Sequence, residues 1–347
     1  MKFLLFTDPH WSQNSSVVRT QGQKYSTRLE NLIQSMNWLE NLAVEKDCDK
    51  VICAGDFFDS TQLNSQEVTA LKEIRWNGLP HIFLMGNHEA STNTLEYSTL
   101  DVFQLLPNAT VINSCCSTWE GKTEICFLPY ITDRDRKSLT EYFGVPTANQ
   151  KRIIISHNDL KDVQYGGYIS KSGVELTDID NSCDLFFNGH IHNCSWVDKK
   201  TLNIGNLTGS AFGEDGYKYQ HYVVIVDTDH IDDDPELIEN PFAFNFFKLD
   251  FTNCSNDQIE NILYQLVDKH PVISAAVTSE NHDFVKQLLD KIAVVSRVIS
   301  SSAVIKQDLQ DTSVFTGVDH LQQFREYVKQ VFGNNDVCNE ELEMIMR

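Results

Sequence analysis

The stretch HIFLMGNHE (residues 81–89) places an apolar run directly before Gly86-Asn87-His88-Glu89. About four consecutive strongly apolar residues, bounded by turn residues, are typical of a strand buried on both faces. An amide and an imidazole therefore stand side by side where a buried strand should end. In that position they either cap a turn or face a charged ligand.

Four other stretches in the first two thirds of the chain have the same form. They are KFLLFTDPH (2–10), KVICAGDFFD (50–59), RIIISHND (152–159) and DLFFNGHIH (184–192). Between them, apolar residues at helical spacing predict a helix at 28–44, and the segments 65–76 and 94–106 are expected to form two more. Strands that alternate with helices predict an α/β domain with both sheet faces covered. Later strands are predicted at 201–209 and 220–228.

The last third of the chain has a different organisation. The acidic segment DTDHIDDDPELIENP (227–241) is predicted to be a linker or exposed loop. Beyond it, a strand-helix-strand-helix-strand order predicts a small α+β domain. Its elements are predicted at 244–251, 256–269, 271–279, 282–292 and 294–302.

A tail begins near Thr312 and carries an apolar stripe at helical spacing, which Gly333-Asn334-Asn335 would end. The stripe consists of Val318, Leu321, Phe324, Val328 and Val331. We therefore predict three parts, at residues 1–230, 242–308 and 312–347.

Composition limits the class of protein. The chain has 347 residues, 41% of them hydrophobic and 22% charged, as in soluble globular proteins. No apolar run approaches the ~20 residues of a membrane span. The apolar stretch before Asp8 is shorter than the ~7–15 residues of a signal peptide's apolar region. We therefore expect a cytoplasmic protein without a membrane partner, whose nine scattered cysteines are free thiols.

The charge balance opposes direct binding to nucleic acid. There are 28 Lys and Arg residues against 49 Asp and Glu residues, a formal net charge of -21. Backbone phosphates are repelled by an acidic surface. Any function on DNA must therefore explain where the phosphate contacts come from.

The polar residues that end the five predicted strands form a metal-ligand set. They are Asp8, His10, Asp56, Asn87, His88, His157, His190 and His192. In open α/β sheets, ligands bind outside the carboxyl ends of the strands. Carboxylates together with imidazoles favour Mn²⁺, Fe²⁺ or Zn²⁺, whereas Ca²⁺ and Mg²⁺ prefer oxygen alone. One such match says little, because a polar residue after a strand often caps a turn. Five matches at successive strand ends favour a shared metal site.

The ordered motifs DPH, GD, GNHE, SH and GHIH resemble those of the calcineurin-like metallophosphoesterase superfamily. Within it, the chain is most similar to SbcD-like nucleases, the nuclease subunits of complexes that process DNA double-strand breaks. The resemblance implies an α/β fold, an α/β/β/α sandwich with a small α+β capping domain and a C-terminal helical tail. It also implies two divalent metal ions, with Mn²⁺ the expected one.

Carried over position by position, the resemblance implies two ligand sets that share Asp56. The first metal would be held by Asp8, His10, Asp56 and His192. The second would be held by Asp56, Asn87, His157 and His190. His88 would be free of metal and would face the scissile phosphate as the catalytic residue.

One departure from the family pattern concerns Asp59. Some members, archaeal and eukaryotic ones especially, carry a histidine three residues after the bridging aspartate, where GDFFD has Asp59. This form is similar to the bacterial one and implies the cytoplasm of a bacterium or of a phage-infected cell. We expect Asp59 and Glu89 to support a ligand or a turn rather than to perform chemistry.

The resemblance also implies a substrate and partners. The chain would act on DNA as a double-strand exonuclease and single-strand endonuclease. It would dock an SbcC-like coiled-coil ATPase through Leu321, Phe324, Val328 and Val331, although a terminal helix packed on its own domain remains an alternative. A homodimer would form through residues 62–76 and 94–106.

Two other functions compete with this prediction. A small-molecule phosphodiesterase stays open, because such enzymes keep the His pair of GHIH. A protein phosphatase is disfavoured, because GDFFDS lacks the Asp-Arg-Gly that follows the bridging aspartate there. A binding module without catalysis has no physical need for the complete ligand set.

The basic residues that could contact DNA are few and scattered. They are Arg134, Arg136, Lys137, Lys151, Arg152, Lys199 and Lys200. We therefore predict that the isolated protein binds DNA weakly and that its ATPase partner supplies much of the phosphate contact.

Overall fold

Strand β1 (Lys2–Phe6) lies between two apolar layers, because its side chains alternate. Leu4 and Phe6 belong to one buried cluster together with helix α1 (Thr27–Glu45). Phe3 and Leu5 belong to another, which also contains Ile153 of strand β7 (Lys151–Ser156). The computed structural model describes residues 1–13, 24–90, 98–147, 150–165 and 168–300.

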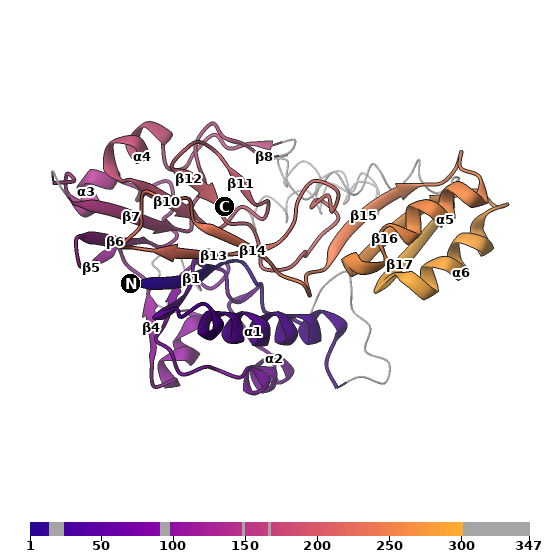
Figure 1. Cartoon of the computed structure of the whole chain (residues 1–347), viewed down its shortest axis with the longest axis horizontal. Coiled ribbons are helices and arrows are strands. Elements are labelled where there is room, and N and C mark those ends of the chain that lie inside the picture. The colour runs from indigo at the N-terminus through magenta and orange to yellow at the C-terminus, as the bar shows by residue number, and fades with distance from the viewer. Residues whose placement is uncertain (14–23, 91–97, 148–149, 166–167, 301–347) are drawn as a thin grey trace, which may run out of the picture. The chain divides into compact units, whose positions relative to one another are not determined.

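The first sheet has the strand order β14-β13-β1-β2-β3-β4. Strands β1 to β4 are parallel, and β13 and β14 extend the sheet antiparallel. The bounds of the strands not yet given are β2 (Lys50–Cys53), β3 (His81–Leu84), β4 (Ala109–Ile112), β13 (Tyr222–Asp227) and β14 (Glu236–Glu239). Helix α1 and helix α2 (Ser65–Ala70) cover its outer face, as Figure 1 shows.

The second sheet has the order β11-β12-β10-β7-β6-β5 and packs against the first. Its other strands are β5 (Cys116–Glu120), β6 (Thr123–Leu128), β10 (Leu185–Asn188), β11 (Ser195–Trp196) and β12 (Thr201–Asn203). Helices α3 (Leu139–Phe143) and α4 (Leu176–Ser182) lie on its outer face, where a separate core contains Ile154, Leu139 and Ile179. The short pair β8 (Gln164–Tyr165) and β9 (Tyr168–Ile169) is separate. The predicted α/β/β/α sandwich is therefore confirmed.

A three-stranded parallel sheet follows, in the order β15-β16-β17. Its strands are β15 (Asn245–Asp250), β16 (Pro271–Val277) and β17 (Val295–Ser300), joined by α5 (Asn256–Tyr264), the 3₁₀ turn η3 (Val267–Lys269) and α6 (His282–Ile292). The unit has its own core, with Phe247, Ile259, Ile273 and Leu289 among its members. The predicted strand-helix order is present.

Three local predictions were wrong. The helix predicted at 65–76 ends at Ala70 and continues only as the 3₁₀ turn η1 (Leu71–Glu73). The reason is that side chains of α1 bind the backbone N–H groups that follow: Arg75 N–H donates to Asn37 Oδ1 at 2.7 Å, and Asn77 N–H donates to Glu40 Oε2 at 3.0 Å.

Of the helix predicted at 94–106, the described part is a 3₁₀ helix, η2 (Thr99–Leu105). Its Phe103 stacks on Phe83 with ring centroids 4.0 Å apart.

The third error concerns the acidic segment 227–241. Its second half forms β14, which pairs with β13 in an antiparallel register that sets Val224 opposite Leu237. Only residues 228–235 between the strands form the predicted loop.

The tail that was predicted from residue 312 lies outside the described residues, and so do Leu321, Phe324, Val328 and Val331. Among the described helices, none is both long and apolar enough to cross a membrane.

Candidate metal centre

The loops that follow β1 and β2 are joined backbone to backbone. Asp8 N–H donates to Gly55 O at 3.1 Å, and His10 N–H donates to Asp56 O at 3.2 Å. Asp8, His10, Asp56 and His190 all adopt left-handed backbone conformations, with φ between 47° and 70°. Such conformations are costly for residues other than glycine and cluster at functional sites. The strand ends are therefore held in a strained arrangement that brings their side chains together.

Two glycines permit this close approach. Gly55, with φ of 109°, leaves room for His157, since an added Cβ would lie 2.1 Å from its Nδ1. At Gly86 an added Cβ would lie 2.0 Å from Asp56 Oδ1 and 2.5 Å from its backbone nitrogen. The glycine in each motif is therefore required by the neighbouring ligand candidate.

We expect Gly86→Ala to displace Asp56 and to weaken the binding of a divalent cation by at least about tenfold, the lower range seen when the support of a metal ligand is removed. Isothermal titration with Mn²⁺ measures this. Gly213→Ala is the control, because an added Cβ there meets nothing within 4 Å. Equal Mn²⁺ affinity of the Gly86 variant and the wild type would contradict the prediction.

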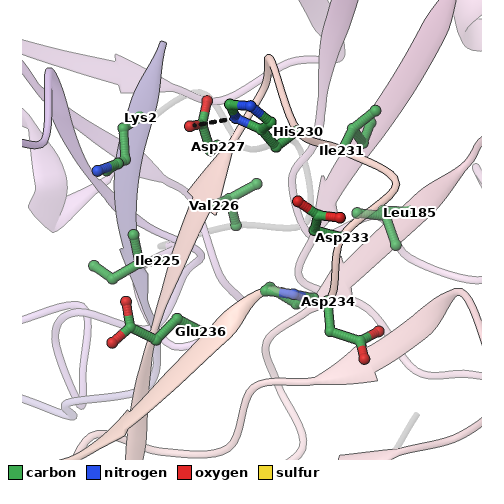
Figure 2. A pocket seen from close by; sticks show the side chains of 11 residues that line it. Lys2, Leu185, Ile225, Val226, Asp227, His230, Ile231, Asp233, Asp234 and Glu236 are labelled. Atoms are coloured by element: carbon green, nitrogen blue, oxygen red, sulfur yellow. Dashed lines mark hydrogen bonds and ion pairs between the residues drawn. The ribbon is translucent and has the colours of Figure 1, made fainter.

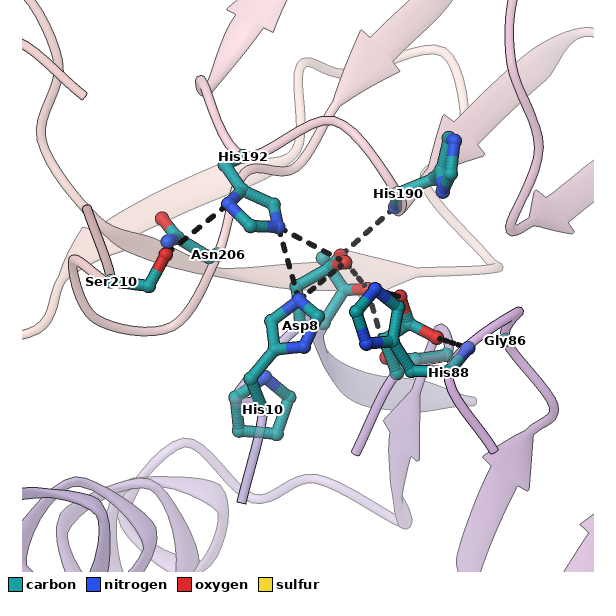
Figure 3. A network of polar contacts seen from close by, with 12 residues as sticks. Asp8, His10, Gly86, His88, His190, His192, Asn206 and Ser210 are labelled. Carbon is teal, nitrogen blue, oxygen red and sulfur yellow. Dashed lines mark hydrogen bonds and ion pairs between the residues drawn. The ribbon is translucent and has the colours of Figure 1, made fainter. Parts of the chain in front are cut away.

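A first group of possible ligands consists of Asp8, His10 and His192. The two imidazoles face each other with their Nε2 atoms 3.0 Å apart. Asp8 Oδ1 lies 3.6 Å from the Nε2 of His10 and 3.9 Å from that of His192. Figure 3 shows these side chains pointing toward one another. The other oxygen of Asp8 accepts from the backbone N–H of His190 at 2.9 Å and from the hydroxyl of Thr7 at 2.6 Å.

A second group consists of Asp56, His157 and His190. Asp56 Oδ2 lies 3.1 Å from His157 Nε2. Asn87 Oδ1 lies 3.0 Å from His190 Nδ1, so its side chain reaches the same group. His157 Nε2 is also 4.0 Å from Asp8 Oδ1, which places the two groups side by side.

Each of the four imidazoles has its other nitrogen beside an acceptor outside the cluster. His10 Nδ1 lies 3.2 Å from Asp59 Oδ1, and His192 Nδ1 lies 2.8 Å from Glu214 Oε1. The remaining two acceptors are the Ala54 carbonyl, 2.8 Å from His157 Nδ1, and Asp159 Oδ2, 3.5 Å from His190 Nε2. Outer acceptors of this kind fix the ring orientation of metal-binding histidines.

The donor set fits divalent cations. Asp8 Oδ1 and His157 Nε2 are buried, and neither makes a hydrogen bond of good geometry to any described residue, although both lie beside the other ligand candidates. Ligand atoms that surround one cation at ~2.1 Å lie about 3–3.5 Å from one another, close to the separations found here. Nitrogen and carboxylate donors without cysteine suit Mn²⁺, Fe²⁺ or a catalytic zinc.

The charges within the cluster also favour a bound cation. Burial would raise the pKa of Asp8, but His157 and His10 outweigh burial and lower it to about 2. Burial would lower the pKa of His157, but Asp56 and Asp8 raise it to about 9. The carboxylates therefore favour positive charge in this buried space. Cations and protons would compete for it, so metal binding should release protons.

His88 lies at the exposed rim. Its side chain is 40% exposed, with Nε2 4.0 Å from Asp56 Oδ2. Its Nδ1–H donates to the Asp59 carbonyl at 2.9 Å, and its backbone N–H donates to Asp56 Oδ1 at 2.9 Å. With His10 and Asp56 it forms a third possible ligand group, which the sequence did not indicate.

Asp59 and Glu89 support the cluster from different sides. Asp59 lies beside the rings of both His10 and His88. Glu89 is fully buried and accepts from the backbone N–H groups of Gly86, at 2.8 Å, and Phe58, at 3.0 Å. It therefore ties the loop after β2 to the loop after β3.

Sequence reasoning missed Glu214 and Asp159. Glu214 lies in GEDG, a polar stretch 22 residues after His192 that has no periodic pattern. Asp159 offered a weak signal, because it stands two residues after His157 in the same strand-end motif.

A hollow of about 370 Å³ beside β13 and β14 shares no residue with the metal-ligand candidates. Figure 2 shows Lys2, Asp227, His230 and Asp233 around it. Asp227 accepts from His230 Nδ1 at 3.0 Å, so its lining is already partly paired.

A comparison with protein families agrees with this site. The model of the family described as calcineurin-like phosphoesterase matches residues 1–194. Among solved structures, the chain is similar to the protein TT1561 of Thermus thermophilus, with 10% identity, a TM-score of 0.40, and coverage of 69% of this chain and 98% of that one. It is also similar to a dimetal phosphatase from Danio rerio, with 12% identity, a TM-score of 0.39, and coverage of 65% and 91%. A search of curated proteins found no match.

Proposed function

The chain belongs to the calcineurin-like phosphoesterase family, and we propose that it is a Mn²⁺-dependent phosphodiesterase that acts on DNA as the nuclease subunit of an SbcCD-like complex. The family uses two divalent metal ions. The observation that carries the phosphoesterase part is the convergence of Asp8, Asp56 and four imidazoles, each imidazole with its outer nitrogen beside an acceptor.

We assign Asp8, His10, Asp56 and His192 to one ion, and Asp56, Asn87, His157 and His190 to the other. When bound, two such ions supply an activated water and positive charge for the phosphate oxygens. Two divalent cations also outweigh the two carboxylates, so the loaded cluster attracts a phosphodiester.

His88 is the proposed proton donor to the leaving oxygen. Its Nδ1–H is engaged by the Asp59 carbonyl, which fixes the ring and leaves Nε2 facing Asp56 at the rim of the cluster. In the protonated imidazolium, the Nε2 proton is the one free to transfer. General acid catalysis of this kind contributes about 10²–10⁴-fold.

The unit from β15 to β17 favours a macromolecular substrate over a small one. It lies beyond the residues that match the family, and a small phosphodiester needs no second domain for recognition. The apolar stripe of the tail, predicted to dock an SbcC-like ATPase, also favours this function. The homodimer through residues 62–76 and 94–106 stays a prediction.

The second candidate is a small-molecule phosphodiesterase, and the acidic charge balance of the chain favours it. Several of the basic residues that could contact DNA already form ion pairs with carboxylates: Arg136 with Asp133, Lys151 with Asp232, and Arg152 with Glu124. With a net charge of -21, the chain has few basic residues left to hold a DNA backbone.

For the first candidate, whose substrate is DNA, we propose that the ATPase partner supplies much of the phosphate contact.

An assay with Mn²⁺ separates the two candidates. Linear duplex DNA, single-stranded DNA and bis(p-nitrophenyl) phosphate are compared, with and without the ATPase partner. We expect hydrolysis of the small ester by the subunit alone and cleavage of duplex DNA that rises when the partner and ATP are added. Asp56→Asn serves as the blank for contaminating nucleases. Turnover of the small ester without DNA cleavage under any condition would favour the second candidate.

A further inference from the structure

Arg28, the second residue of helix α1, is an arginine that the proposed chemistry does not use. It is 2% exposed, and its guanidinium donates to two backbone carbonyls. Nη2–H donates to Pro9 O at 2.7 Å, and Nη1–H donates to Gly209 O at 2.7 Å. Both of these partners are carbonyls rather than carboxylates, which is unusual for a buried charge.

The first carbonyl belongs to the loop that carries two candidate ligands. Pro9 stands between Asp8 and His10, the members of the first group that follow β1. A donor at this carbonyl fixes the Pro9–His10 peptide plane, from which the His10 side chain projects and which Pro9 joins to Asp8. Asp8 and His10, on either side of Pro9, both adopt left-handed backbone conformations, so this stretch is costly to hold without such support.

The second carbonyl belongs to the loop that orients His192, the third member of that group. Gly209 precedes Ser210, whose backbone N–H donates to Glu214 Oε2 at 2.8 Å and whose hydroxyl donates to Oε1 at 2.6 Å. Glu214 Oε1 is the acceptor beside His192 Nδ1. One guanidinium thus bridges the two loops that position all three side chains of the first group.

The charge of Arg28 is costly in this place. A cation near a helix N-terminus opposes the helix dipole, and burial removes it from water. Burial lowers the pKa of Arg28 to about 10, while the carboxylates of Glu214 and Asp59 favour its charged form. These are the same carboxylates that lie beside the Nδ1 atoms of His192 and His10.

We infer that Arg28 is a positioning residue for the first metal, holding the Pro9 and Gly209 carbonyls so that Asp8, His10 and His192 meet. The inference rests on the proposed function, because it presupposes that this group holds an ion. It assigns to α1 a role at the site beyond covering the sheet.

Mn²⁺ binding by three variants of the full chain tests the inference. Arg28→Met keeps the bulk of the side chain but loses both donors. Arg28→Lys keeps the charge, but one ammonium cannot reproduce the planar fork that reaches both carbonyls. Arg152→Met is the matched control, because Arg152 is also buried and donates to backbone carbonyls, those of Phe143, Gly144 and Ser182, but is paired with Glu124 away from the cluster.

Isothermal titration gives the number and affinity of Mn²⁺ sites, and electron paramagnetic resonance distinguishes a coupled pair of Mn²⁺ ions from isolated ones. We expect two sites in the wild type and in Arg152→Met, although the latter should unfold at a lower temperature. In Arg28→Met we expect one site weakened by about 10–100-fold and loss of the coupled signal. In Arg28→Lys the same site should weaken less.

The outcomes distinguish the inference from the proposed function. A wild type that binds no Mn²⁺ would contradict the metal site itself. Two sites of wild-type affinity in Arg28→Met would overturn the positioning role alone. If Arg28→Met does not fold, Arg28→Lys decides: a selective loss of one site supports the role, and unchanged binding overturns it.

Discussion

Replacing Asp56 by asparagine is expected to remove Mn²⁺ binding at both sites and to reduce phosphodiester hydrolysis by at least about 10³-fold. Asp56 belongs to two of the possible ligand groups, and its Oδ2 lies 3.1 Å from His157 Nε2. Asparagine has a similar shape but no charge, so it cannot bridge two cations. Cations supply several kcal/mol of charge stabilisation in the transition state, and each 1.36 kcal/mol is tenfold in rate. Titration with Mn²⁺ and steady-state hydrolysis measure the two effects.

The control for Asp56→Asn is Glu40→Gln. Glu40 is another fully buried carboxylate that faces an imidazole, with Oε1 2.8 Å from His81 Nε2, but it belongs to α1 and none of the ligand groups contains it. We expect Glu40→Gln to lower the unfolding temperature and to keep both Mn²⁺ sites. If Asp56→Asn also kept both sites at wild-type affinity, the proposed bridging role would be wrong.

That these candidate ligands lie close together was predictable, because they follow the ends of neighbouring strands. Asp8, Asp56 and His157 stand one to three residues after the ends of β1, β2 and β7, and parallel strands present their carboxyl ends at one edge of a sheet. No long-range geometry was needed to expect that such side chains meet. The resemblance of the motifs to a known family then implied which of these side chains share a metal ion.

The residues that support the ligand candidates were harder to predict, because nothing local marks them. Glu214 lies in a loop whose sequence has no periodic pattern, and Arg28 has the sequence pattern of an ordinary polar position in an amphipathic helix. Their partners are backbone carbonyls or distant rings, as in Arg28 Nη1 to Gly209 O. Such contacts depend on tertiary placement and leave no periodic signal.

In the fold, too, the elements marked by a local sequence pattern were predictable, and those that depend on tertiary placement were not. Strands with near-continuous apolar runs, such as β1 and β7, were predictable because both of their faces are buried. Strand β14 was not, because it is an edge strand whose exposed Glu236 and Glu239 match the acidic loop before it. The predicted α-helix at 94–106 was wrong in its described part, because aromatic packing of Phe103 and 3₁₀ hydrogen bonds dominate there.

His88→Ala is expected to lower kcat by about 10²–10⁴-fold while both Mn²⁺ sites keep their affinity, because the proposed role of His88 is proton donation rather than metal binding. His88→Asn is the matched variant. Its side-chain amide can still donate to the Asp59 carbonyl, as His88 Nδ1–H does, but its N–H protons are too weakly acidic to be transferred to the leaving oxygen. Equal loss of activity in both variants would assign the effect to proton transfer rather than to an altered loop.

The leaving group provides a sharper test of this role. p-Nitrophenolate departs without a proton, whereas the sugar oxygen of DNA requires one. Loss of a general acid should therefore reduce DNA cleavage far more than hydrolysis of bis(p-nitrophenyl) phosphate. The opposite result is that His88 binds a metal ion, as its place beside His10 and Asp56 in the third ligand group would allow. If His88→Ala weakened Mn²⁺ binding and slowed both substrates equally, His88 would be a metal ligand, and the proton would have to come from another group.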